Sequence, residues 1–217
     1  MIAVWMARRS MDGAAASRRV ICALLLCMIV TGCGDRTPNL PHLAPDAVVL
    51  AFGDSLTFGT GAAATQSYPA ALNRLIGRQV VSEGVPGEVS ASGLARLPAV
   101  LDQVQPQLLI LCHGGNDLLR QLDTAALARN LRAMVRLARD RGIPVLLIAV
   151  PKPGLFPSAH PIYTELAAEM VLPIEEDALA KILTDNSLKS DPIHPNAQGY
   201  ARLAERVAEL LEKAKAL

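Results

Sequence analysis

A serine near the start of the chain and an aspartate–histidine pair near its end have the residue types and spacing for nucleophilic catalysis. The serine lies in Gly-Asp-Ser-Leu, residues 53–56, directly after an apolar run. Asp191 and His194 are three residues apart, in a segment where prolines prevent regular structure. A serine hydroxyl is a weak nucleophile at neutral pH, and it needs a base and a group that orients the base. The pattern therefore predicts Ser55 as nucleophile, His194 as base and Asp191 as the orienting carboxylate.

Two further segments between these ends have the residue types of an oxyanion hole. They are Gly-Val-Pro-Gly at 84–87 and Gly-Gly-Asn-Asp at 114–117. A tetrahedral intermediate carries an oxyanion that needs hydrogen-bond donors fixed in advance. The candidate donors are the backbone N–H groups of Ser55 and Gly87 and the side-chain amide of Asn116. Structural alternatives stay open, because a glycine after proline also suits a plain turn and an asparagine after two glycines also tolerates unusual backbone angles.

The three residues of the predicted catalytic set have structural alternatives as well. A serine after glycine and aspartate is often a helix N-cap or a turn residue, and an aspartate before proline often forms an Asx-turn. Of the four histidines in the chain, His194 alone has a carboxylate at a spacing that can orient its ring. His113, beside an apolar run, and the aspartates Asp54 and Asp117 are interpreted as residues that brace loops.

Apolar runs alternate with helical patterns along the chain, which favours βαβ units around a parallel sheet. Strands are expected at 47–53, 79–82, 107–112, 143–150 and 171–174, and helices at 68–77, 91–104, 124–141, 163–170 and 197–213. Thr124 is the expected N-cap of the third helix, and Gly142 its expected stop. Each candidate residue then follows a strand. Because open α/β sheets bind ligands at the carboxyl ends of their strands, we expect the candidates to converge there.

The four segments, in this order, resemble those of the SGNH (GDSL) hydrolase family over most of the chain. Ser55, Gly87 and Asn116 match the family's serine, glycine and asparagine, and Asp191 and His194 match its Asp-x-x-His pair. The resemblance implies an α/β fold, a three-layer α/β/α sandwich with a flavodoxin-like parallel sheet. It also implies hydrolysis of carboxylic esters through an acyl-serine intermediate.

Two stretches, Gly-Thr-Gly at 59–61 and Ser-Gly-Leu-Ala-Arg-Leu-Pro at 92–98, resemble the family's bacterial arylesterase, lysophospholipase and acyl-CoA thioesterase branch. This implies a small-molecule or lipid ester as substrate. Apolar residues near the site are expected either to form an acyl groove or to pack against helices: Leu118, Leu119, Leu122, Leu155 and Phe156. The alternatives are a carbohydrate O-acetylesterase of the same family and a non-catalytic envelope lipoprotein that binds lipid or glycan.

Residues 1–32 have the features of a bacterial lipoprotein signal peptide. Four arginines precede an apolar run at 20–30, which is shorter than the ~20 residues of a spanning helix. The run ends in Val-Thr-Gly-Cys, which resembles a lipobox, so Cys33 is the expected lipidation site. An ordinary secretory signal is the alternative. Residues 33–46, which contain three prolines, are expected to form an extended tether, and residues 47–217 the hydrolase domain. The expected location is the bacterial cell envelope, with membrane attachment through the lipid.

Composition restricts the possible partners. Without residues 1–32, which hold four arginines and one aspartate, the formal net charge changes from +1 to −2, and no basic patch is evident. We therefore expect no nucleic-acid partner. The sequence contains no metal-ligand spacing and no convincing dinucleotide or phosphate loop, so no metal and no cofactor are expected. Cys112 lies in an apolar run and is expected to be a buried thiol. The sequence leaves the oligomeric state open.

Overall fold

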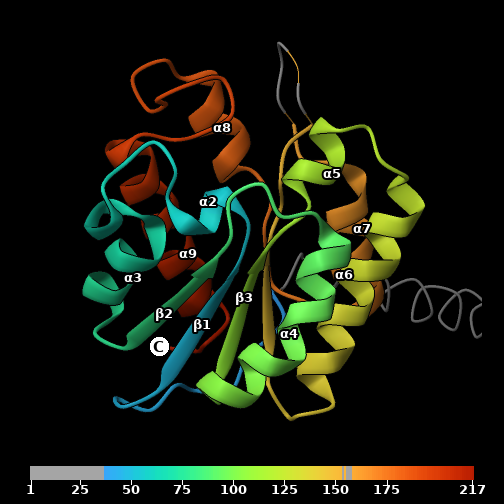
Figure 1. Ribbon diagram of the computed structural model, residues 1–217. Helices are drawn as coiled ribbons and strands as arrows, with labels where there is room; N and C mark the ends of the chain where they lie inside the picture. Colours follow the sequence, from blue (N-terminus) through green and yellow to red (C-terminus); the bar gives the residue numbers. More distant parts are fainter. Residues whose placement is uncertain (1–36, 153, 155–157) are drawn as a thin grey trace, which may run out of the picture. The chain divides into compact units, whose positions relative to one another are not determined.

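The computed structural model describes residues 37–152, 154 and 158–217. The signal segment, Cys33, Leu155 and Phe156 lie outside the described residues. The strands are β1 (Val48–Gly53), β2 (Gln79–Gly84), β3 (Leu108–Cys112), β4 (Val145–Ile148) and β5 (Ile174–Glu175). They form one parallel sheet in the order β2-β1-β3-β4-β5 (Figure 1). This is the predicted flavodoxin-like order.

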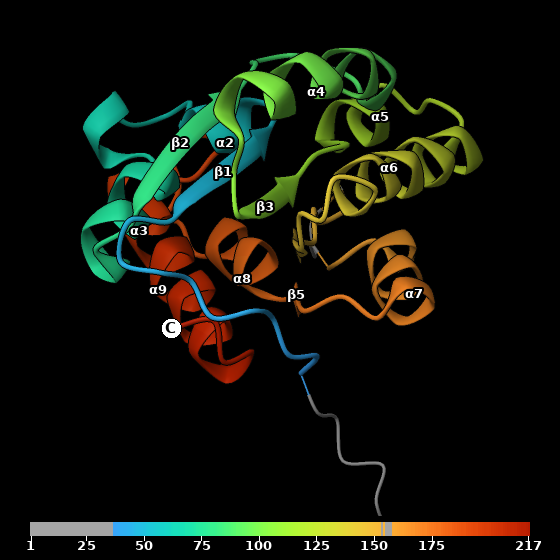
Figure 2. The ribbon, with the colours of Figure 1, turned by 90° about the horizontal axis from the view of Figure 1, so that it is seen from below.

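Helices cover both faces of the sheet. They are α2 (Ser55–Phe58), α3 (Tyr68–Ile76), α4 (Ser90–Val104), α5 (Gly115–Leu119), α6 (Thr124–Arg139), α7 (Pro161–Met170), α8 (Ala178–Thr184) and α9 (Ala197–Lys213), with a 3₁₀ turn at Ala64–Gln66. Viewed from below, α3 and α9 lie on one side of the strands and α4, α6 and α7 on the other (Figure 2). The three-layer α/β/α architecture is therefore confirmed. Within the described part of the chain, no helix combines the length and the apolar character needed to cross a membrane.

The central strands are apolar along their whole length because helices cover both of their faces. Every residue of β3 and β4 is buried, and so are the last five residues of β1. Cys112, at the end of β3, is fully buried and has a free thiol, as predicted. This core keeps the strand ends in fixed positions.

The carboxyl ends of β1, β2 and β3 lie level with one another. Gly53 pairs in register with Gly84 on one side and with Cys112 on the other. Glycine is required at positions 53 and 84. A Cβ at Gly53 would lie 1.9 Å from the Cys112 carbonyl oxygen, and one at Gly84 would lie 2.1 Å from the Phe58 nitrogen. The segments that follow these strands therefore start side by side at one edge of the sheet.

The predicted elements differ from the structure in several places. Helices α2, α5 and α8 were not predicted, because four to seven residues are too few to show a helical period. The fifth strand was expected at 171–174, but Val171 ends α7 with a φ of 50°, and the strand is Ile174–Glu175. The N-cap of α6 is Asp123 rather than Thr124, since the Asp123 side chain accepts the Ala125 N–H.

The described part of the expected tether packs against the domain. Leu43 is buried, and its N–H donates to the Ala216 carbonyl at 2.8 Å. The Leu40 N–H donates to the Ala214 carbonyl at 2.8 Å, so this segment lies along the end of α9. Residues 40–43 of this segment are therefore in contact with the domain.

Candidate active site

Ser55, His194 and Asp191 meet at the carboxyl edge of the sheet. Nε2 of His194 lies 3.0 Å from Oγ of Ser55, although the two residues are 139 positions apart. Nδ1 of the same ring lies 2.8 Å from Oδ2 of Asp191. Ser55 opens α2 directly after β1, while the aspartate and the histidine come from the loop between α8 and α9. The fold thus brings together the three residues that the sequence singles out.

The carboxylate of Asp191 determines which nitrogen of His194 carries a proton. Burial raises the pKa of the Asp191 carboxyl, but hydrogen bonds from the His194 ring and from the Ile193 and His194 backbones lower it below its ordinary value of 3.8. An ionised carboxylate only accepts hydrogen bonds, so Nδ1 of His194 is the donor. Nε2 then presents its lone pair to the Ser55 hydroxyl, which is the arrangement that proton abstraction requires.

Asp54 connects the serine segment to the asparagine segment. Its Oδ1 accepts the Leu56 N–H at 3.1 Å and caps α2, and its Oδ2 accepts the Gly115 N–H at 3.1 Å. The side chain is 1% exposed, and burial raises the pKa of its carboxyl above the ordinary value despite nearby His113 and these backbone bonds. Asp54 therefore braces two loops, as expected from the sequence.

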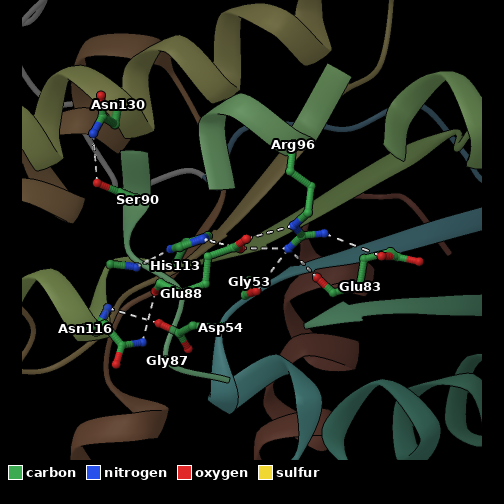
Figure 3. A network of polar contacts seen from close by, with 12 residues as sticks. Gly53, Asp54, Glu83, Gly87, Glu88, Ser90, Arg96, His113, Asn116 and Asn130 are labelled. Carbon is green, nitrogen blue, oxygen red and sulfur yellow. Dashed lines mark hydrogen bonds and ion pairs between the residues drawn. The ribbon is translucent and has the colours of Figure 1, made fainter. Parts of the chain in front are cut away.

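Asn116 contacts the segment that contains Gly87 (Figure 3). The Asn116 side-chain amide donates one hydrogen bond, 3.0 Å long, to the carbonyl of Glu88, the residue after Gly87. Gly87 has a φ of 77°, in the left-handed region that favours glycine, and its carbonyl accepts a 2.9 Å bond from Arg120. The structure therefore joins the two segments for which the sequence predicts oxyanion donors.

A cavity of about 350 Å³ opens at this edge of the sheet, and Ser55, Asn116 and His194 line it. Gly87 is not among the described residues that line it. Much of the remaining wall is apolar, formed by Leu56, Leu119, Val150, Pro151, Leu183 and Ile193. The reactive groups thus lie at the surface of a largely apolar cavity.

The expected acyl-groove residues have different positions. Leu119 lines the cavity, Leu118 is buried, and Leu122 is exposed without lining it. The cavity is also lined by Val150, Leu183 and Ile193, which come from three separate segments and were not predicted from the sequence. Two of these had a usable signal, because Val150 is the second residue after β4 and Ile193 lies inside the Asp-x-x-His segment.

The described residues contain no group of three or more His, Cys, Asp or Glu side chains placed to hold a metal ion.

Comparison with known proteins identifies the family. The model of the GDSL-like lipase/acylhydrolase family matches residues 51–202, which include every residue of the site described above. The chain belongs to this family. Membership also makes it an ester hydrolase of the SGNH type, as the sequence motifs predicted.

Individual relatives within the family cover most of the chain. Esterase TesA of Pseudomonas aeruginosa is 32% identical over an alignment of 182 positions, and the match covers 77% of this chain and 89% of that protein. The thioesterase 1/protease 1/lysophospholipase L1 of Escherichia coli K12 is 30% identical over an alignment of 172 positions, and the match covers 76% of this chain and 83% of that protein. The crystal structure of TesA matches with a TM-score of 0.70 and 30% identity, covering 77% of this chain and 99% of that chain.

Proposed function

We propose that Ser55, His194 and Asp191 form the catalytic triad of this ester hydrolase. The observation that carries the proposal is the pair of contacts made by one imidazole ring, at 3.0 Å to the Ser55 hydroxyl and at 2.8 Å to the Asp191 carboxylate. A nucleophile, a base and a group that orients the base are thereby in hydrogen-bonding sequence.

In the proposed reaction, Oγ of Ser55 attacks the ester carbonyl carbon while Nε2 of His194 accepts the hydroxyl proton. The bond to the leaving group breaks as His194 returns that proton to the departing oxygen or sulfur, which leaves an acyl-Ser55. A water molecule then attacks the acyl carbon and gives a proton to His194. Transfer of that proton to Oγ releases the carboxylic acid and restores the enzyme. Asp191 keeps the ring oriented and stabilises the imidazolium.

Three donors would stabilise the oxyanion of each tetrahedral intermediate: the N–H groups of Ser55 and Gly87 and the side-chain amide of Asn116. One N–H of that amide donates to the Glu88 carbonyl, and the other is the proposed donor to the oxyanion. Because these donors belong to packed loops, little reorganisation is needed as charge develops.

The substrate class follows from the cavity wall. A volume of about 350 Å³ lies within the usual range of small-molecule sites, and the side chains of Leu119, Val150, Leu183 and Ile193 suit an apolar acyl group. We propose esters or thioesters with such an acyl chain, including aryl esters and lysophospholipids. Two relatives, an esterase and a thioesterase/lysophospholipase, have names that agree with this class.

A series of p-nitrophenyl esters tests both parts of the proposal. We expect kcat/KM to rise from acetate to butyrate or longer chains, and Ser55→Ala to abolish turnover while thermal unfolding stays unchanged. A fluorophosphonate should label the wild type and spare Ser55→Ala. Activity confined to acetate would favour a carbohydrate O-acetylesterase. Labelling without turnover of any ester would instead favour a non-catalytic lipid-binding or glycan-binding role.

We further propose that the protein is exported and held at a membrane of the bacterial envelope by a lipid on Cys33. The motive is the basic segment, the apolar run and the Val-Thr-Gly-Cys sequence at 30–33. Intact-mass analysis of the membrane fraction should find a mature chain that starts at Cys33 and carries acyl groups. A start at another residue, or an unmodified cysteine, would indicate an ordinary secretory signal.

A further inference from the structure

Glu88, which follows Gly87 in the loop after β2, lies at the centre of a buried charged cluster (Figure 3). Its side chain is 7% exposed. Arg96, on α4, donates to both carboxylate oxygens, from Nε at 3.0 Å and from Nη2 at 2.8 Å. Nε2 of His113, whose side chain is fully buried, lies 3.1 Å from the same carboxylate. The proposed reaction uses none of these three side chains.

The hydrogen bonds define the charge of the Glu88 carboxyl. The Gly114 N–H donates to Nδ1 of His113 at 2.8 Å, so Nδ1 is an acceptor and Nε2 carries a proton for Glu88. Burial raises the pKa of the Glu88 carboxyl, but the bonds from His113 and Arg96 lower it to about 2. The carboxylate is therefore ionised at neutral pH and receives three directed donors, which holds it in one place.

The partners of Glu88 are themselves anchored to the sheet. The Arg96 guanidinium lies 4.1 Å from the centroid of the Phe52 ring, and its Nη2 donates to the Glu83 carbonyl at 3.1 Å. The carbonyl of His113 accepts a 2.8 Å bond from the hydroxyl of Tyr163. The cluster thus connects the Glu88 side chain to the ends of β1, β2 and β3.

The backbone of Glu88 touches both loop-derived oxyanion donors. Its nitrogen follows Gly87 in the chain, and its carbonyl accepts the amide of Asn116 at 3.0 Å. We propose that Glu88 is a positioning residue of the oxyanion hole: its carboxylate, held by Arg96 and His113, holds Gly87 and Asn116 in the geometry that receives the oxyanion. This inference rests on the proposed function, in which these two residues supply donors.

The first test is Glu88→Gln, which keeps the shape of the side chain and removes its charge. We expect kcat to fall roughly 10-fold to 10²-fold, because small displacements of catalytic groups cost that much, with KM within about twofold of wild type. Glu175→Gln is the matched control. Glu175 is a buried carboxylate paired with Arg206 at 3.3 Å outside the cavity, so its loss should leave kcat unchanged.

A double-mutant cycle with Asn116→Ala separates positioning from a general loss of stability. If Glu88 acts through Asn116, the loss of kcat in the double variant is much smaller than the product of the two single losses. Losses that multiply, or a Glu88→Gln variant with wild-type kcat, would overturn the inference. So would a change confined to KM.

Arg96→Lys is the second variant, in case Glu88→Gln does not fold. Lysine keeps the charge but lacks the planar fork that binds both carboxylate oxygens, so a smaller loss confined to kcat is expected. Wild-type kcat in Arg96→Lys would count against the inference.

Failure of the proposed function is recognised separately, since a Ser55→Ala variant that still hydrolyses esters would remove the acyl-serine mechanism. An inactive Ser55→Ala together with unaffected Glu88 and Arg96 variants would remove only the positioning role.

Discussion

Asp191 combines two structural roles in one carboxylate. Its Oδ1 accepts the N–H groups of Ile193 and His194, each at 2.9 Å, and closes an Asx-turn, while its Oδ2 accepts the His194 ring. The turn and the ring therefore depend on the same side chain. A spacing of three residues is enough for the His194 ring to reach the Asp191 carboxylate, because the turn folds the histidine back over the aspartate.

This geometry predicts unequal effects within the proposed triad. His194→Ala should lose about as much kcat as Ser55→Ala, because triad members act as a unit and their losses do not add. Asp191→Asn should lose less than either, since its carbonyl oxygen still closes the turn while the amide orients the ring poorly. Steady-state kinetics of the three single variants and of the Ser55/His194 double variant checks this. A double variant far below both singles would contradict the shared mechanism.

Asn116 is the second residue with a testable role. Asn116→Ala should lower kcat by roughly 10²–10³-fold with little change in KM, the usual result of removing one oxyanion donor. Hydrolysis of a short p-nitrophenyl ester by wild type and variant measures both constants. If only KM changes, Asn116 binds substrate or supports the loop, and it does not stabilise the oxyanion.

At the scale of elements, the buried carboxylate of Asp117 connects the short helix α5 to the long helices α4 and α6. Asp117 in α5 accepts the Ser90 N–H at 2.8 Å and the Ser90 hydroxyl at 2.6 Å at the start of α4. Asn130 of α6 donates to the same hydroxyl at 2.9 Å. A five-residue helix has little stability of its own, so these bonds hold α5, and with it Asn116, in place.

Removal of this connection should destabilise the protein. Asp117→Ala leaves two buried Ser90 donors without their acceptor, so we expect the free energy of unfolding to fall by about 1–3 kcal/mol. Urea denaturation measures the change. Asp123→Ala, which removes an exposed cap from the Ala125 N–H, is a milder control. Equal losses of unfolding free energy in the two variants would show that the buried hydrogen bonds of Asp117 stabilise the protein no more than the exposed cap of Asp123.

At the scale of the whole molecule, the ionised Glu88 links stability to pH. Its pKa is about 2 in the folded protein against an ordinary value of 4.5, so the unfolded chain binds this proton more readily. The stabilisation is complete above pH 4.5 and is lost as pH falls toward 2. We expect the free energy of unfolding to fall over this window, and the Glu88→Gln variant to show a smaller fall. Denaturation curves at several acidic pH values test it, and parallel slopes in both proteins would refute it.

The sequence by itself was enough for the four longer strands of the sheet and for the residues that are proposed to carry the chemistry. Buried strands such as β3 are continuous apolar runs, and amphipathic helices such as α9 repeat over many turns, so both kinds of element leave a local signal. The serine and the Asp-x-x-His segment are also local patterns, and their order matches the strand order.

The tertiary structure decided what depends on contacts between distant segments. The short helices α2, α5 and α8, the packing of the segment around Leu43 and the apolar wall of the cavity have no local period. The charged cluster around Glu88 contains residues from a loop, from α4 and from the end of β3. Their spacing in the sequence does not indicate that they are in contact. The energy of such contacts comes from burial and hydrogen bonding between elements, which exist only once the sheet and its helices have packed.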